Sequence, residues 1–202
     1  MRREATLFVA SLAALLTACG QLSSQPPKVA DRHAHCDLAS EKPEAITDAV
    51  TAEPIARELR AWAEDVRPNE PRDEGARFWA TRLPCNEMVI AWRLGRGFCG
   101  SGGCSLFVWD GSDQRLRPLA RVPVTWMPVR LLEGRVEGRP VLAAWTQGGG
   151  ILQGYERPFR FDGTEYPMTT DWDLRVAPEA AGVALLSSSR AMDDGLPLYP
   201  AG

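Results

Sequence analysis

The chain has 202 residues, a formal net charge of −3 and a hydrophobic fraction of 45%, which suits one domain with its own apolar core. The mild acidity argues against nucleic-acid binding, because proteins of that class usually present a basic face. The 16 prolines and 18 glycines indicate many turns and argue against a helical bundle.

The N-terminus has the pattern of a bacterial export signal. Two arginines precede an apolar stretch, Leu7–Leu16, which is too short to span a membrane as a stable helix. The stretch ends in Leu16-Thr17-Ala18-Cys19, and this order of an aliphatic residue, two small residues and a cysteine resembles the lipobox of bacterial lipoproteins. The resemblance implies that residues 1–18 are a signal peptide and that Cys19 carries lipid, so several acyl chains anchor the protein stably.

The same resemblance implies a location in the cell. Gly20, rather than aspartate, follows Cys19, which favours lipid anchoring in the outer membrane, facing the periplasm, over the inner membrane. Residues 19–35 are polar and contain a Pro-Pro pair, so we expect a lipidated tether that leads into a folded unit. The membrane is therefore the first expected partner, and an envelope protein or peptidoglycan is the second.

The strongest helix signal runs from Glu53 to Val66. Its apolar residues share one helical face, and they are Ile55, Leu59, Trp62, Ala63 and Val66. Pro54 suits the first turn of such a helix, and Pro68 marks its end. We therefore expect residues 36–76 to form a helical N-terminal segment.

From Phe78 onward the pattern changes to short strands separated by turn residues. The expected strands are Met88–Leu94, Cys104–Trp109, Arg115–Val122, Thr125–Leu132, Val141–Thr146 and Tyr155–Phe161, with a last short element at Gly182–Leu186. Asp162-Gly163 predicts a hairpin turn, with Thr164–Tyr166 as the returning strand. The predicted fold class is mainly β (α+β): an antiparallel sheet, or a small barrel or sandwich, over residues 77–190. The N-terminal amphipathic helix packs on it, and residues 191–202 form a loose tail.

Four cysteines remain once Cys19 is assigned to lipid: Cys36, Cys85, Cys99 and Cys104. Exported compartments are oxidising, so an even number of cysteines predicts disulfide bonds. Of three possible connectivities we favour Cys99–Cys104, which closes a glycine-rich segment, and Cys36–Cys85, which ties the helical segment to the sheet. A redox-active pair is the alternative, but it usually needs a helix N-terminus beside the thiolate.

Two glycine-rich loops are the expected binding surface, because loops on a rigid scaffold often carry recognition. They span Gly97–Gly103 and Gln147–Gly154. Their candidate contact residues are Gly97, Gly100, Ser101, Gly102, Gly103, Gly148, Gly149 and Gly150. Residues 95–100 also match G-x-G-x-x-G, but a strand rather than a helix follows, so we reject dinucleotide binding and expect no cofactor.

Few residues suit metal binding or catalysis. His33 and His35 lie beside Cys36, which makes them weak candidates for holding Zn²⁺ or Cu²⁺. They belong to the tether, where no rigid outer shell is evident, so we expect no metal centre. No G-x-S-x-G motif is present and both histidines lie outside the sheet, so we assign no catalytic residue and expect no enzyme.

Seven tryptophans are many for this length, and exposed ones can stack on sugar rings, as can Tyr155 and Tyr166. Strand alternation puts Trp92 and Trp145 each on a face with two apolar neighbours, which favours core packing. Glycan binding is the alternative.

The stretch Cys99–Tyr166, with its glycine-rich loops and Phe-Asp-Gly turn, resembles small exported bacterial β-domain proteins that are mostly uncharacterised. The loop at Ser101-Gly102-Gly103 is also similar to the loop that periplasmic lysozyme inhibitors insert into their target enzyme. We predict an envelope lipoprotein with a non-catalytic binding or structural role. The alternatives are a glycan- or lysozyme-binding lipoprotein, a metal-binding lipoprotein, and a hydrolase without recognisable motifs.

Overall fold

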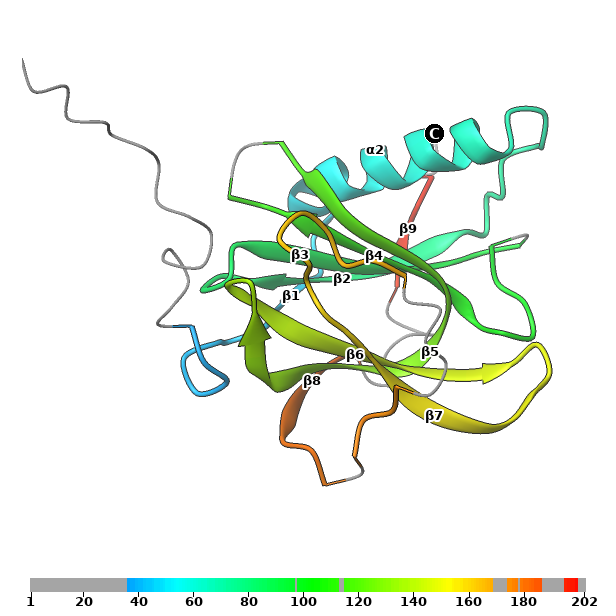
Figure 1. The fold of residues 1–202 in the computed structure, drawn as a ribbon. Helices are drawn as coiled ribbons and strands as arrows, with labels where there is room; N and C mark the ends of the chain where they lie inside the picture. Colours follow the sequence, from blue (N-terminus) through cyan, green and yellow to red (C-terminus); the bar gives the residue numbers. More distant parts are fainter. Residues whose placement is uncertain are drawn as a thin grey trace, which may run out of the picture.

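The computed structural model describes residues 36–96, 98–112, 115–168, 174–177, 179–186 and 195–199. These residues form one helix and nine strands (Figure 1). In chain order the elements are β1 (Glu44–Ile46), α2 (Ala49–Val66), β2 (Arg77–Leu83), β3 (Met88–Leu94), β4 (Cys104–Asp110), β5 (Arg117–Val136), β6 (Arg139–Gly148), β7 (Ile151–Phe159), β8 (Gly182–Leu186) and β9 (Leu196–Pro197).

The nine strands form one antiparallel sheet, as the sequence predicts. Strands β1 to β7 are neighbours in chain order, while β8 pairs with β5 and β9 pairs with β2. The long strand β5 pairs with β4 through its first half and with β6 and β8 through its second half. The sheet therefore folds back along β5, so that its second half covers one face of its first half (Figure 1). It does not close into a barrel.

The central strands are buried on both faces, because helix α2 covers one face and the second half of the sheet covers the other (Figure 1). Along β3, Met88, Ile90 and Trp92 pack into the larger core between the two halves of the sheet. Val89 and Ala91 point the opposite way, into the core beneath α2. This alternation is the side-chain period of a strand, and it confirms the core position expected for Trp92.

Helix α2 starts earlier than the apolar pattern predicts. Asp48 caps it by accepting a hydrogen bond from the backbone N–H of Thr51 at 2.8 Å. Pro54 is therefore the sixth residue of the helix rather than part of its first turn. Leu59 is fully buried against the sheet, whereas Val66, expected on the buried face, is exposed at the last position. Within the described ranges, no helix combines the length and apolarity needed to cross a bilayer.

Three predicted strands are wrong in detail. The strands expected at 115–122 and 125–132 are the two halves of β5, because the chain stays extended through Pro123 and Pro128 while it changes partners. Thr164–Tyr166 is no strand. Instead, Tyr166 inserts its ring into the core and its hydroxyl donates a hydrogen bond to the carbonyl oxygen of Pro140 at 2.9 Å.

The tail expected to be loose is ordered between residues 195 and 199. Its strand β9 pairs with β2, and Leu198 is fully buried beneath α2. The backbone N–H of Leu198 also donates to the carbonyl oxygen of Ala76 at 2.9 Å. A buried leucine and strand pairing hold this short segment against the domain.

The segment 36–76, expected to be helical, also contains a strand, because β1 lies within it.

Candidate functional site

The two glycine-rich loops meet at one end of the sheet (Figure 1). A Cβ atom added to Gly148 would lie 1.7 Å from the carbonyl oxygen of Ser101, and Gly148 has a φ of +80°. A Cβ on Gly103 would lie 2.1 Å from the carbonyl oxygen of Thr125. The backbones are thus in direct contact, and only glycine allows this approach. Of the predicted contact residues, Gly97 lies outside the described part of the chain.

A disulfide bond closes the first loop. Cys99 and Cys104 are bonded, and Gly100 and Gly103 exchange two backbone hydrogen bonds of 2.9 and 3.0 Å between them. Cys36 is bonded to Cys85, so the predicted disulfide bonding is confirmed in the connectivity that the sequence favours. The short bridge holds Ser101 exposed while Gly102 and Gly103 are buried against β5.

A cavity of about 490 Å³ lies where the loops meet the C-terminal end of α2. Its wall combines the loop residues with Trp62, Phe98, Arg67 and Arg121. The guanidinium of Arg121 lies 4.1 Å from the Trp62 ring centroid, and the Trp62 and Phe98 rings meet edge to face at 4.9 Å. None of the described wall residues is acidic. We call this surface the loop face.

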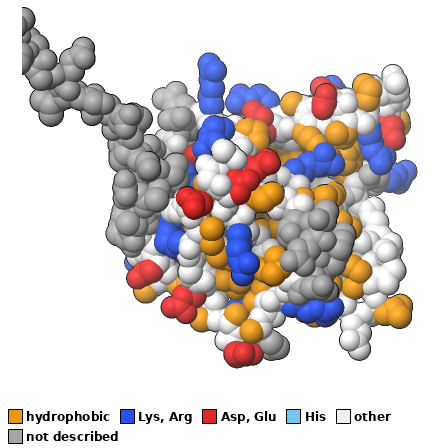
Figure 2. All heavy atoms as spheres, in the orientation of Figure 1, with side chains coloured by type: hydrophobic (Ala, Val, Ile, Leu, Met, Phe, Trp, Pro, Cys, Tyr) orange, Lys and Arg blue, Asp and Glu red, His pale blue; other side chains and the backbone are white. Residues whose placement is uncertain are grey.

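Sequence reasoning found the glycines of the loop face but missed its aromatic and arginine residues. The helical pattern predicts Trp62 on the buried apolar face, but the residue is half-buried at the cavity wall. Arg121 was an ordinary strand residue without any motif. On the side of the molecule shown in Figure 2, basic and acidic side chains are interspersed with hydrophobic ones and do not form a single charged patch.

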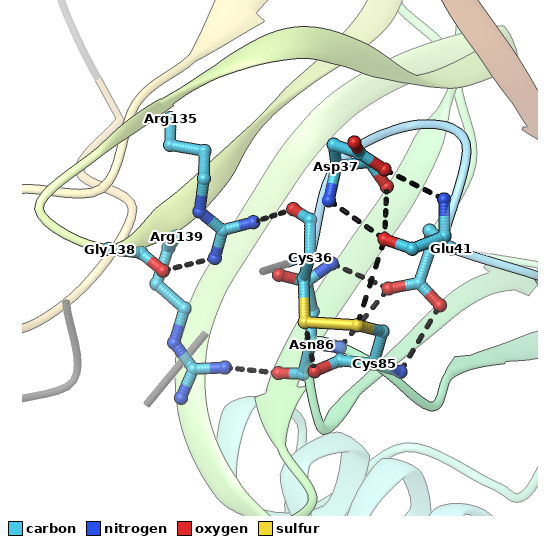
Figure 3. Close-up of a disulfide and its surroundings, with 9 residues drawn as sticks. Cys36, Asp37, Glu41, Cys85, Asn86, Arg135, Gly138 and Arg139 are labelled. Atoms are coloured by element: carbon cyan, nitrogen blue, oxygen red, sulfur yellow. Dashed lines mark hydrogen bonds between the residues drawn. A yellow bond between two sulfur atoms is a disulfide. The ribbon is translucent and has the colours of Figure 1, made fainter. Parts of the chain in front are cut away.

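The opposite end of the sheet holds Cys36, the first residue that the structure describes, and Figure 3 shows its surroundings. Beyond the disulfide to Cys85, Arg135 donates hydrogen bonds to the carbonyl oxygens of Cys36 and Gly138. The buried carboxylate of Glu41 accepts from the backbone and side-chain nitrogens of Asn86, at 3.1 and 2.5 Å. These contacts fix the start of the domain to both halves of the sheet.

Arg139 extends this bonding into the core. Its guanidinium is 1% exposed and donates to the carbonyl oxygen of Asn86 and to the carboxylate of Asp110, both at 2.6 Å. Burial would raise the pKa of Asp110, but hydrogen bonds from Ser112 and Arg117 and the charge of Arg139 together lower it to about 2. Asp110 is therefore ionised and paired at neutral pH, which makes the cluster structural.

The two ends are joined by the same strands. Strand β3 starts beside Cys85 and ends at the first loop, while β6 starts at Arg139 and ends at Gly148. Seven residues of extended chain, the length of β3, span roughly 23 Å. Cys36 and the loop face therefore lie at opposite ends of the sheet (Figure 1).

A second cavity of about 720 Å³ opens on the outer face of β6 and β7. Half-buried Trp145 lines it together with Tyr155, Glu156 and Arg175, and the Arg175 guanidinium lies 4.3 Å from the Tyr155 ring centroid. The Tyr155 hydroxyl is buried without a hydrogen-bond partner among the described residues. The core position expected for Trp145 is thus only half right, because its indole faces this cavity.

Comparison of the chain with protein-family models, with curated proteins and with solved structures found no match. The lipidation site Cys19 and the metal candidates His33 and His35 lie outside the described residues. Among the residues that the structure does describe, no three His, Cys, Asp or Glu side chains gather closely enough to hold a metal ion.

Proposed function

We propose that this protein is a lipoprotein of the cell envelope, anchored through Cys19 in the outer membrane on its periplasmic side, that binds another envelope protein without catalysing a reaction. The lipobox supports the anchor. The loop face supports binding, since tryptophan and arginine side chains are enriched where protein interfaces concentrate their binding energy.

The observation that carries the proposal is the position of the loop face at the end of the sheet opposite Cys36. A tether that enters at Cys36 leaves the loops on the far side of the domain, away from the anchored end. The disulfide to Cys85 and the Arg135 hydrogen bonds keep this orientation fixed relative to the sheet. Such an arrangement suits a protein that presents a recognition surface to the space beyond its membrane.

Replacing Cys19 by alanine should move the protein from the membrane fraction to the soluble fraction. Without the thiol no lipid can be attached, and we expect the short apolar signal segment alone to give no stable membrane anchor. Cell fractionation with immunoblotting measures the change, and Ser23→Ala in the tether is the matched control that should stay membrane-bound. If the Cys19 variant stayed in the membrane fraction, the lipoprotein proposal would be wrong.

A second candidate function is glycan binding at the Trp145 cavity. A half-buried indole that lines the cavity beside an arginine, a carboxylate and a hydroxyl without a partner among the described residues suits a sugar ring and its hydroxyls. Peptidoglycan is the glycan to test first, because it fills the compartment that the lipobox implies.

Soluble peptidoglycan fragments should quench the tryptophan fluorescence of the protein if this second function holds. Trp145→Ala should weaken binding roughly tenfold, since it removes the stacking surface. Met168→Ala, at another exposed apolar residue, should leave the titration unchanged. Equal titrations for the wild-type protein and the Trp145 variant would exclude glycan binding in this cavity.

A further inference from the structure

Arg93, near the end of β3, carries a buried guanidinium, two of whose nitrogens have no hydrogen-bond partner among the described residues. It is 1% exposed, and its Nε and Nη1 atoms donate to no described residue. The Phe98 ring centroid lies 3.4 Å from the guanidinium carbon, and the Trp62 ring centroid lies 5.5 Å from it. The aromatic rings cover the faces of the guanidinium, so its N–H groups are left to bond in its plane.

The acidic side chains nearby are already engaged. The Asp73 carboxylate accepts hydrogen bonds from the backbone N–H groups of Arg96 and Gly75, at 2.5 and 3.2 Å. The Glu70 carboxylate accepts two bonds from Arg67, at 2.9 and 2.7 Å. These carboxylates therefore do not supply the acceptor that Arg93 lacks.

Arg93 lines a small cavity of about 50 Å³ between the end of α2 and the 70–73 loop, and this cavity shares Arg67 and Phe98 with the loop face. Four arginines and three acidic residues surround it: Arg67, Arg72, Arg93, Arg96, Glu64, Glu70 and Asp73. One positive charge is therefore left over. Burial lowers the pKa of Arg93 to about 10, although Tyr199 and Asp73 oppose the shift, which is the behaviour of a desolvated charge with too little compensation.

We infer that this cavity binds a single carboxylate group of an acidic ligand, with Arg93 as its principal donor. A planar carboxylate matches the fork of N–H groups on a guanidinium. Its one negative charge balances the one unpaired positive charge, whereas a doubly charged phosphate would leave the cavity negative. The cavity has room for the carboxylate alone, so the remainder of the ligand lies outside, beside exposed Arg96. The inference is independent of the lipid anchor and of any partner of the loop face.

The test is a titration of the full-length protein in detergent, followed by NMR of the arginine Nε–Hε signals and by calorimetry. The first carboxylate probe is acetyl-alanyl-alanine, and its neutral match is the same peptide with a C-terminal amide. The second is N-acetylmuramic acid, and its neutral match is N-acetylglucosamine. Inorganic phosphate is the third anion tested. We expect the Arg93 signal to move with at least one carboxylate and not with its neutral match. The probe that moves it distinguishes a peptide terminus from a sugar acid.

Arg93→Gln should weaken carboxylate binding at least tenfold, while Arg160→Gln, at an exposed arginine outside the cavity, should leave it unchanged. If Arg93→Gln fails to fold, Arg96→Gln at the rim replaces it and should weaken binding several-fold while the Arg93 signal is retained. An Arg93 signal that no carboxylate moves, equal binding of the charged and neutral probes, or tighter binding of phosphate would each overturn the inference.

Discussion

Replacing Asp110 by asparagine should lower the free energy of unfolding by about 3 kcal/mol at pH 7. Arg139 is 1% exposed, and the Asp110 carboxylate is the acidic partner of its guanidinium. Asparagine keeps the shape and one acceptor oxygen but removes the charge, so a buried cation loses its compensation. Urea unfolding of the purified protein measures the loss, and Asp65→Asn on the exposed side of α2 should change it by less than about 0.5 kcal/mol.

The same pair predicts how stability depends on pH. The pKa of Asp110 is lowered in the folded protein from 3.8 to about 2, so its contribution is fully present above pH 4 and is lost as the pH falls toward 2. The asparagine variant lacks this contribution, and its disadvantage should therefore shrink between pH 4 and pH 2. A difference that stays constant down to pH 2 would show that the ion pair does not stabilise the fold.

Replacing Gly148 by alanine should separate the two loops of the loop face. The added Cβ would lie 1.7 Å from the Ser101 carbonyl oxygen, and the residue has a φ of +80°. We expect a loss of roughly 3 kcal/mol in unfolding free energy, about 1 from the left-handed backbone and about 2 from overpacking. Binding of the proposed envelope partner should fall by at least an order of magnitude, because the loop positions shift.

Gly149→Ala is the matched control for this substitution. Its φ of +58° is also left-handed, but a Cβ there meets no atom within 4 Å. It should therefore lose only about 1 kcal/mol of unfolding free energy. If Gly149→Ala and Gly148→Ala were equally damaging in urea unfolding, the close contact between the loops would not be the cause.

The local features of this fold could be predicted from the sequence. An apolar run bounded by turn residues predicted β3, and the even number of cysteines left after Cys19 predicted two disulfide bonds. Glycine-rich spacing also identified the two loops. These features depend on residues close together in the chain, or on chemistry that cysteine alone supplies.

The remaining features depend on contacts between distant segments, which no periodicity records. Leu198 is buried only because the chain returns to β2 after more than a hundred residues. Ser101 and Gly148 come into contact only because the sheet folds back along β5. Arg93 and Arg121 have no motif, and they become part of a site only when α2 brings Trp62 to them.

Site-specific photo-crosslinking in intact cells tests most directly whether the loop face recognises an envelope protein. A photoreactive residue at exposed Ser101 should give one protein adduct of defined mass, and the adduct should disappear when Gly148→Ala is added. The same residue at Val50, which is 85% exposed at the other end of α2, should give none. No adduct from Ser101, or identical adducts from both positions, would contradict the proposed function.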